Sequence, residues 1–205
     1  MDVVRSFIAI ELPQDVRAEL TSLEDRLKAR CHPFVKWVEP ESMHLTLKFL
    51  GNVAVDSIPQ IVAAMSGVAR SHSPFKLQVT GTGAFPNWQR PQVVWVGVGG
   101  ELDRLNSLQK ALESELSPLG FSPESHSFSA HLTLGRLRDR VTTNDRRRFA
   151  EFAQNITFET SLSFEVNAMR LMKSQLTPAG PIYSELAVVS LGSHQQCTGT
   201  GMTTK

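Results

Sequence analysis

The sequence predicts an α+β fold built from two copies of one unit. The tetrapeptide His-Leu-Thr-Leu occurs at residues 44–47 and again at residues 131–134. Both copies follow an apolar run and a stretch with leucines at helical spacing, and both precede a second helical stretch and a second apolar run. Because the flanks repeat together with the tetrapeptide, the pattern indicates an internal duplication.

Each half reads strand, helix, His-Leu-Thr-Leu strand, helix, strand. In the first half, Ser6–Ile10 and Phe75–Val79 are predicted as the outer strands. The two helices are predicted from apolar residues at helical spacing: Val16, Leu20, Leu23 and Leu27 before the motif, and Ile58, Ile61, Val62, Met65 and Val68 after it.

The second half repeats this order at a distance of 131 − 44 = 87 residues, which carries Phe7 onto Val94 within the matching strand. Val93–Val98 is predicted as its first strand, and Phe158–Leu171 is strand-like at its end. The intervening helices are predicted from Leu102, Leu105, Leu108, Leu112 and Leu116, and from Phe149, Phe152, Ala153 and Ile156.

Two halves of about 90 residues are each marginal alone and are expected to pack together. We therefore predict one domain over residues 1–192, made of two pseudo-symmetric lobes. Residues 193–205 are small and polar and are expected to form a disordered tail.

Composition excludes several classes of function. The 205 residues carry a net charge of +1, so any anion site must be local. The stretch from Arg136 to Arg148 is locally basic, and its Arg146–Arg148 run is interpreted as a solvated helix face. Cys31 and Cys197 lie in unrelated contexts, which argues against a zinc site or a disulfide framework and suits the cytoplasm. No apolar stretch has the length of a membrane span.

The repeated His-x-Thr pattern points to acid–base chemistry. Side chains alternate along a strand, so His44 and Thr46 share one face while their leucines share the other, and the second motif behaves alike. If a pseudo-twofold relates the halves, both pairs face one cleft. One neutral imidazole can then take a proton from water while the other, protonated, gives one to a leaving oxygen. The threonine hydroxyls can donate to phosphate oxygens, and no metal or cofactor is required.

The remaining histidines lie beside proline or serine and are interpreted as solvated: His32, His72, His126 and His194. Neither motif region has the His-x-His or clustered acidic spacing of a metal site.

At this point the chain resembles the two-histidine phosphoesterase superfamily, and within it the RNA 2′,3′-cyclic phosphodiesterases, also called 2′-5′ RNA ligases. The resemblance covers about Arg5 to Leu191. It depends on six segments in order: Arg5–Pro13, Trp37–Gly51, Gly83–Asn87, Pro91–Gly97, Phe128–Arg136 and Ser174–Tyr183. The chain departs from the family at Ala130, where proline is usual, and at Gln92, where a basic residue is common.

The resemblance implies a bilobal fold, with two antiparallel sheets around a central cleft and helices on the outside. It implies opening of a terminal 2′,3′-cyclic phosphate of RNA to a 2′-phosphomonoester, with His44 as proton donor and His131 as proton acceptor. Thr46, Thr133 and Arg136 would bind the substrate's phosphate. RNA ends or small cyclic-phosphate nucleotides are the expected partners, and a monomer is the expected state.

Two alternatives remain open on the sequence. The same residues could join RNA halves through a 2′-5′ bond, or the chain could be a nucleotide-binding module without turnover. Three aromatic residues could stack on a base or belong to the core: Trp37, Phe49 and Phe128.

Overall fold

The computed structural model describes residues 2–31, 34–124, 126–156, 158, 162–177 and 180–192. The tail predicted over residues 193–205 lies outside these ranges, as do His32, His194 and Cys197. Within them, none of the helices is both long and apolar enough to cross a bilayer.

The first half of the chain contains the predicted elements and one additional short strand. In order these are β1 (Val3–Glu11), α1 (Gln14–Cys31), β2 (Val35–Trp37), the 3₁₀ helix η2 (Pro40–Ser42), β3 (His44–Ala54), η3 (Val55–Ser57), α2 (Ile58–Arg70) and β4 (Phe75–Phe85). The predicted apolar stripe of α1 is fully buried, which confirms the helical interpretation of its leucine spacing.

The second half repeats the order with β5 (Val93–Gly100), α3 (Leu102–Leu116), η4 (Ser117–Leu119), β6 (His131–Leu137), α4 (Thr143–Gln154) and β7 (Ser163–Val166), followed by β8 (Ala168–Leu176) and β9 (Pro181–Ser190). Gly100 has a φ of +90°, a left-handed conformation that suits glycine and turns the chain from β5 into α3. Thr142 caps α4 by accepting a hydrogen bond from the Asp145 amide at 3.2 Å.

One prediction about these elements was wrong. The strand-like stretch Phe158–Leu171 contains the whole of β7 and only the beginning of β8, and Asn167 separates the two strands. The physical reason lies in the pairing, because β7 pairs with β4 whereas β8 pairs with β1. The chain therefore crosses from one part of the sheet to another at Asn167.

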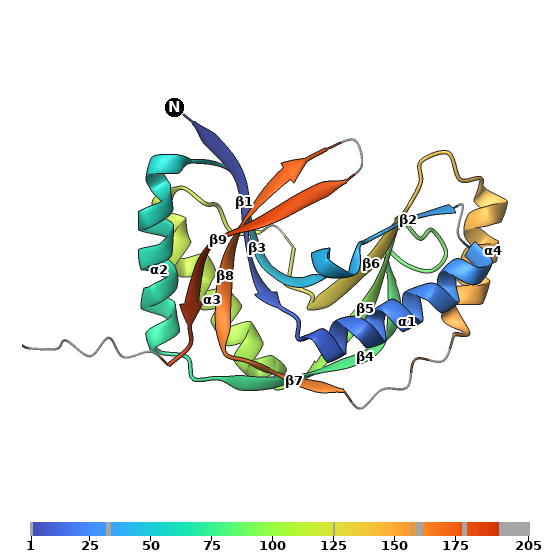
Figure 1. Cartoon of the computed structure of the whole chain (residues 1–205), viewed down its shortest axis with the longest axis horizontal. Coiled ribbons are helices and arrows are strands. Elements are labelled where there is room, and N and C mark those ends of the chain that lie inside the picture. The colour runs from blue at the N-terminus through green and yellow to red at the C-terminus, as the bar shows by residue number, and fades with distance from the viewer. Residues whose placement is uncertain are drawn as a thin grey trace, which may run out of the picture.

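The described strands form one curled, nine-stranded sheet in which all pairings are antiparallel, in the order β7-β4-β5-β6-β3-β1-β8-β9, with β2 paired to β6 (Figure 1). The array has two halves, and the predicted two sheets meet where β3 pairs with β6. The registered contact between these two strands is the single pair Leu45 and Leu132, which are the second residues of the two motifs. The first strands of the two repeats, β1 and β5, flank the two motif strands, so the centre of the strand order is symmetric about β3 and β6.

Each half of the sequence contributes to both halves of the sheet. β4 comes from the first repeat but pairs with β5 of the second, and β8 comes after the second repeat but pairs with β1. Figure 1 shows α2 and α3 together on one side of the molecule and α1 and α4 together on the other. The two repeats are therefore interleaved.

The core lies between the helices and one face of the sheet. The motif leucines Leu45, Leu47, Leu132 and Leu134 are each at most 2% exposed and belong to one cluster with the helix leucines. Burying a leucine contributes roughly 1.5–3 kcal/mol. We call the opposite face, which bears His44 and Thr46, the inner face.

Candidate active site

Both motifs occupy the start of their strands, next to the point where the two halves of the sheet join. His44, Thr46, His131 and Thr133 are half-buried, whereas the leucines between them are buried. The alternation of a β-strand thus places each imidazole and its hydroxyl on the inner face. Since Leu45 is paired with Leu132, the two motifs are neighbours in adjacent strands.

The two imidazoles are held in the same way. Nδ1 of His44 lies 2.7 Å from the carbonyl oxygen of Ser42, and Nδ1 of His131 lies 2.7 Å from the carbonyl oxygen of Ser129. A carbonyl can only accept a hydrogen bond, so each Nδ1 carries the proton and each Nε2 is left for the substrate. Sequence reasoning missed this feature, although Ser-x-His repeats at the same 87-residue spacing: 129 − 42 = 87.

Aromatic rings surround each histidine, and they differ between the two sites. The Phe7 ring stacks on His44 with 4.7 Å between centroids and an angle of 26°, and Tyr183 meets the same imidazole edge-on at 5.2 Å. Around His131, Phe85 lies edge-on at 4.8 Å and Trp95 lies at 6.3 Å. A Cβ at Gly83 would lie 2.1 Å from the Trp95 ring, so glycine makes room for that ring.

Burial and charge act on the titratable groups of the inner face. Burial lowers the pKa of both His44 and His131 below the ordinary value of 6.5, against the effect of the hydrogen bond to the backbone. The positive charge of Arg136 lowers the pKa of His131 further. Burial raises the pKa of Tyr183, while Arg136 and Arg5 act in the opposite direction. The charge of Arg136 therefore acts on a titratable group in each half of the sheet, His131 in one and Tyr183 in the other.

An irregularity in the sheet brings Arg136 onto the inner face. Residues three apart in a regular strand point to opposite sides, so Arg136 and Thr133 would be separated. The register between β5 and β6 shifts between Val94 and Trp95, which leaves Thr133 opposite Trp95 and Arg136 opposite Val93. Trp95 and Val93 share a face of β5, so Thr133 and Arg136 share a face of β6.

The other motif strand has the same irregularity, with an aromatic residue in place of the arginine. Thr46 lies opposite Ala9 and Phe49 lies opposite Phe7, with a register shift between Ile8 and Ala9. Phe49 is 58% exposed on the inner face. The other two aromatic candidates, Trp37 and Phe128, are partly buried and pack against the core.

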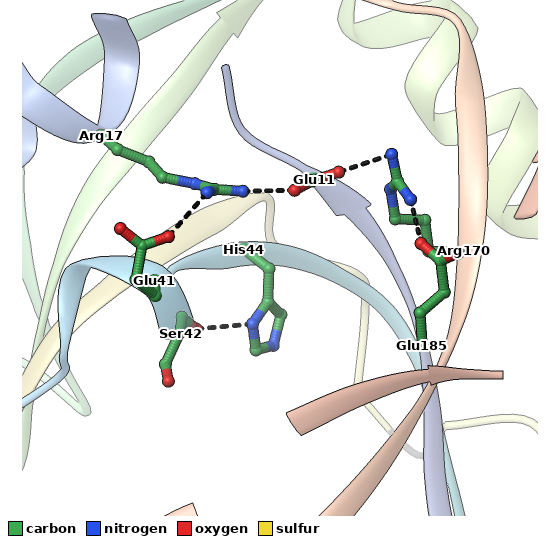
Figure 2. Close-up of polar contacts among 7 residues, drawn as sticks. All are labelled: Glu11, Arg17, Glu41, Ser42, His44, Arg170 and Glu185. Carbon is green, nitrogen blue, oxygen red and sulfur yellow. Dashed lines mark hydrogen bonds and ion pairs between the residues drawn. The ribbon is translucent and has the colours of Figure 1, made fainter. Parts of the chain in front are cut away.

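A chain of ion pairs lies beside His44 (Figure 2). Arg17 contacts Glu11 at 2.6 Å and Glu41 at 3.1 Å. Glu11 also contacts Arg170 at 2.5 Å, and Arg170 contacts Glu185. Glu41 immediately precedes Ser42, whose carbonyl holds the His44 ring, and Glu11 lies opposite His44 in the neighbouring strand. The chain thus connects α1, β1, η2, β8 and β9 around one histidine.

Two other features bear on ligands. Among the described residues, no group of three or more His, Cys, Asp or Glu side chains is placed to hold a metal ion. The protein has one cavity of about 380 Å³, lined in part by Glu11, Arg17 and Arg170, and another of about 370 Å³ between α3 and residues 123–124 and 126–128. Neither cavity is lined by a motif histidine.

Known proteins are similar to this chain in sequence and in fold. The family described as LigT like Phosphoesterase matches residues 10–95 and again residues 96–183, one match for each repeat. The RNA 2′,3′-cyclic phosphodiesterase of Methanothermobacter thermautotrophicus is 35% identical over 92% of this chain and 99% of its own length. The protein of the same name from Archaeoglobus fulgidus is 36% identical over 90% of this chain and 99% of its own length.

Solved structures agree with these sequence relations. TT0787 of Thermus thermophilus superposes with a TM-score of 0.73 at 28% identity, covering 92% of this chain and 98% of its own. E. coli LigT, crystallised with 3′-AMP, has the same fold with a TM-score of 0.73 at 24% identity, covering 94% of this chain and 100% of its own. The family matches account for both repeats and the relatives align over nearly the whole chain, so the chain belongs to the LigT-like phosphoesterase family.

Proposed function

We propose that this protein hydrolyses the 2′,3′-cyclic phosphate at the end of RNA to a 2′-phosphomonoester. The observation that carries the proposal is the matched pair of imidazoles, each with its Nδ1 proton held by a backbone carbonyl and its Nε2 left for substrate. Each imidazole stands beside a threonine hydroxyl on the inner face. Membership of a family whose relatives are named RNA 2′,3′-cyclic phosphodiesterase supports this assignment.

The reaction is an in-line displacement at phosphorus. His131, neutral, takes a proton from water as the water oxygen forms a bond to phosphorus. His44, protonated, gives its proton to O3′ as the P–O3′ bond breaks. The two histidines then return to their starting states by proton exchange with solvent. Each proton transfer accelerates the reaction by roughly 10²–10⁴-fold.

The surroundings of the two histidines favour these roles. Arg136 disfavours the protonated form of His131, as a base requires. Burial lowers the pKa of His44, but no cation is among the causes, in contrast to His131, and the face of Phe7 lies against the His44 ring. A positive charge over an aromatic face is stabilised by roughly 0.5–2 kcal/mol, which favours the imidazolium. The substrate's negative phosphate favours it further on binding.

Thr46, Thr133 and Arg136 bind the phosphate in this proposal. The hydroxyls donate hydrogen bonds to the non-bridging oxygens, and the guanidinium offsets the charge that develops there. No step needs a metal ion, so activity in EDTA is expected to equal activity without it.

The direct test uses an RNA oligonucleotide ending in a 2′,3′-cyclic phosphate, in EDTA. The variants His44→Ala and His131→Ala are each expected to lose at least about a hundredfold in kcat. His72→Ala is the matched control, since His72 bonds to the end of α2 and not to the motif strands. The phosphorus NMR spectrum of the product identifies a 2′-phosphate.

Other outcomes would contradict the proposal in distinct ways. A 3′-phosphate product would reverse the assignment of the leaving oxygen. Joining of RNA ends in place of hydrolysis would favour the ligase alternative. Tight binding of cyclic-phosphate nucleotides without turnover would favour the binding module.

Substrate range, oligomeric state and location are also proposals. RNA ends or small cyclic-phosphate nucleotides are the proposed substrates. Both motifs belong to one chain, which supports an active monomer, and light scattering during size-exclusion chromatography measures this directly. A cytoplasmic location stays a prediction.

A further inference from the structure

Three cationic residues lie beyond the second motif, on β6, just after its end and on the neighbouring strand β2. Lys36 of β2 is the registered partner of Arg136 of β6, and Arg138 lies two residues beyond Arg136. The ladder between the two strands continues to that residue, because the amide of Arg138 donates to the carbonyl of Phe34 at 2.9 Å. We call Lys36, Arg136 and Arg138 the basic row.

The basic row lies on the inner face. Val35 and Leu137, which alternate with the row, are paired with each other and are 1% and 7% exposed in the core. Lys36, Arg136 and Arg138 are exposed, as residues on the other face of these strands should be. The row therefore extends from His131 and Thr133 along β6, away from the reacting phosphate.

The charges of the basic row are not neutralised by the protein. None of its three side chains forms an ion pair within the described part of the chain, whereas Arg17 and Arg170, the arginines beside His44, each bind two carboxylates. The backbone of Arg138 is fixed at the same time, because its carbonyl accepts a hydrogen bond from Arg146 Nη2 at 3.1 Å. The backbone positions of these cations are therefore fixed, while their side chains remain available to bind an anion.

The arginines of α4 do not extend the row. The guanidinium of Arg146 donates to the carbonyls of Pro91 and Arg138, and Arg147 pairs with Glu151 on the same helix. Arg148 is exposed on α4. Two of the three residues predicted to form a solvated face are therefore exposed, whereas Arg146 has a structural role.

We propose that Lys36 and Arg138 of the basic row bind the phosphodiester groups that lie 5′ to the terminal cyclic phosphate, beyond the phosphate that Arg136 binds, so that the enzyme prefers oligonucleotides to nucleoside cyclic phosphates. This inference rests on the proposed function. A nucleoside 2′,3′-cyclic phosphate has only the phosphate that reacts, so it leaves Lys36 and Arg138 without a partner. An oligonucleotide supplies further phosphates, and contacts to these cations release counterions from the RNA.

The test compares a tetranucleotide and a cytidine, both ending in a 2′,3′-cyclic phosphate, as substrates of the wild type and of the double variant Lys36→Gln/Arg138→Gln. We expect the ratio of kcat/KM between the tetranucleotide and the nucleoside to fall roughly fivefold or more in the variant. The salt dependence of tetranucleotide binding should weaken by about 1.4 in slope, at about 0.7 for each cation removed from a single-strand site. Binding is measured by fluorescence anisotropy with a tetranucleotide ending in a 2′-phosphate, which does not turn over.

The matched control is the double variant Arg147→Gln/Arg148→Gln. It removes the same two positive charges from the same basic stretch of the sequence, but from α4 instead of the basic row. An equal loss in the control would show that net charge, not the basic row, acts on RNA. An equal loss on both substrates would place the row in folding or chemistry and overturn the inference. If the wild type hydrolyses neither substrate, the proposed function fails instead. If the double variant also binds the tetranucleotide as tightly as the wild type does, by fluorescence anisotropy, the basic row is not an RNA site.

Discussion

At the scale of single residues, the site depends on one hydrogen bond for each histidine. The Nδ1 proton of His44 is fixed by a carbonyl in η2, and Arg17 holds the preceding residue of that turn through Glu41. His131 has the same bond to Ser129 without such a brace among the described ion pairs. The two halves of the site therefore differ in how firmly the imidazole is held.

Removal of this brace should loosen His44 and spare His131. Arg17→Met is expected to lower kcat about fivefold or more with little change in KM, because small displacements of a catalytic group are costly. The ¹⁵N spectrum should show mixing of the His44 tautomers while His131 keeps Nδ1–H. Arg147→Met, which removes an exposed ion pair on α4, is the control. A pure change in stability, with unaltered tautomers, would contradict the role of Arg17.

The charge of Arg136 should appear in the pH profile. Arg136 lowers the pKa of His131, so Arg136→Gln should raise that pKa and move the acid limb of kcat/KM to higher pH. The basic limb, which follows loss of the His44 proton, should stay in place because Arg136 is not among the causes acting on His44. Movement of the basic limb alone would exchange the roles of the two histidines.

Phe49 is the most exposed of the three aromatic candidates for base stacking. It occupies the position in the first motif strand that Arg136 occupies in the second, and its ring lies 6.2 Å from that of Phe7. We expect Phe49→Ala to weaken nucleotide binding by about 1–3 kcal/mol through loss of base stacking. Phe49→Leu keeps the apolar volume without the ring, so full binding by that variant in calorimetry would exclude stacking.

At the scale of elements, a buried ion pair connects β3 to α3. Lys48 follows the first motif, is almost fully buried, and contacts Glu113 at 2.6 Å and the carbonyl of Ser122 at 2.9 Å. Gln109 donates to the other oxygen of the same carboxylate at 3.0 Å. The pair therefore joins the strand of His44 to a helix of the other repeat.

Removal of one partner should cost more than removal of both. Lys48→Met is expected to lower the free energy of unfolding by about 3 kcal/mol, because it leaves Glu113 without its cation in a largely buried site. The double variant Lys48→Met/Glu113→Met should recover most of this loss. Urea unfolding measures both, and additive losses in the double variant would show that the pair is not coupled.

The sequence predicted the helices and strands better than it predicted which strands pair with each other. Helical leucine spacing and the repeated motif predicted α1, α3, β3 and β6, because local periodicity reports which face is buried. It did not reveal that β4 and β8 pair outside their own repeats, since register and crossing depend on contacts far apart in sequence. The bulge that places Arg136 on the inner face could not be predicted for the same reason. Only the family resemblance indicated that Arg136 would bind phosphate.

At the scale of the whole molecule, the interleaved repeats imply that neither half folds alone. Residues 1–89 contain β4 without its partner β5, and residues 90–205 contain β8 without its partner β1. Separately expressed fragments should give the circular dichroism and NMR spectra of unfolded chains, and mixing them should restore structure and activity. A folded isolated half would contradict the prediction of one domain over residues 1–192.

The single pair of Leu45 and Leu132 has a consequence for ancestry. This pair joins two copies of one motif at the centre of a symmetric strand order. Such an arrangement is expected when two identical chains form a dimer by domain swapping. A single-repeat ancestor with this topology would have had its acid and base on different molecules, and its activity would have depended on the square of its concentration when dilute. Fusion of two such copies would make that encounter intramolecular and would allow the two copies to differ, as Phe49 and Arg136 do at equivalent positions.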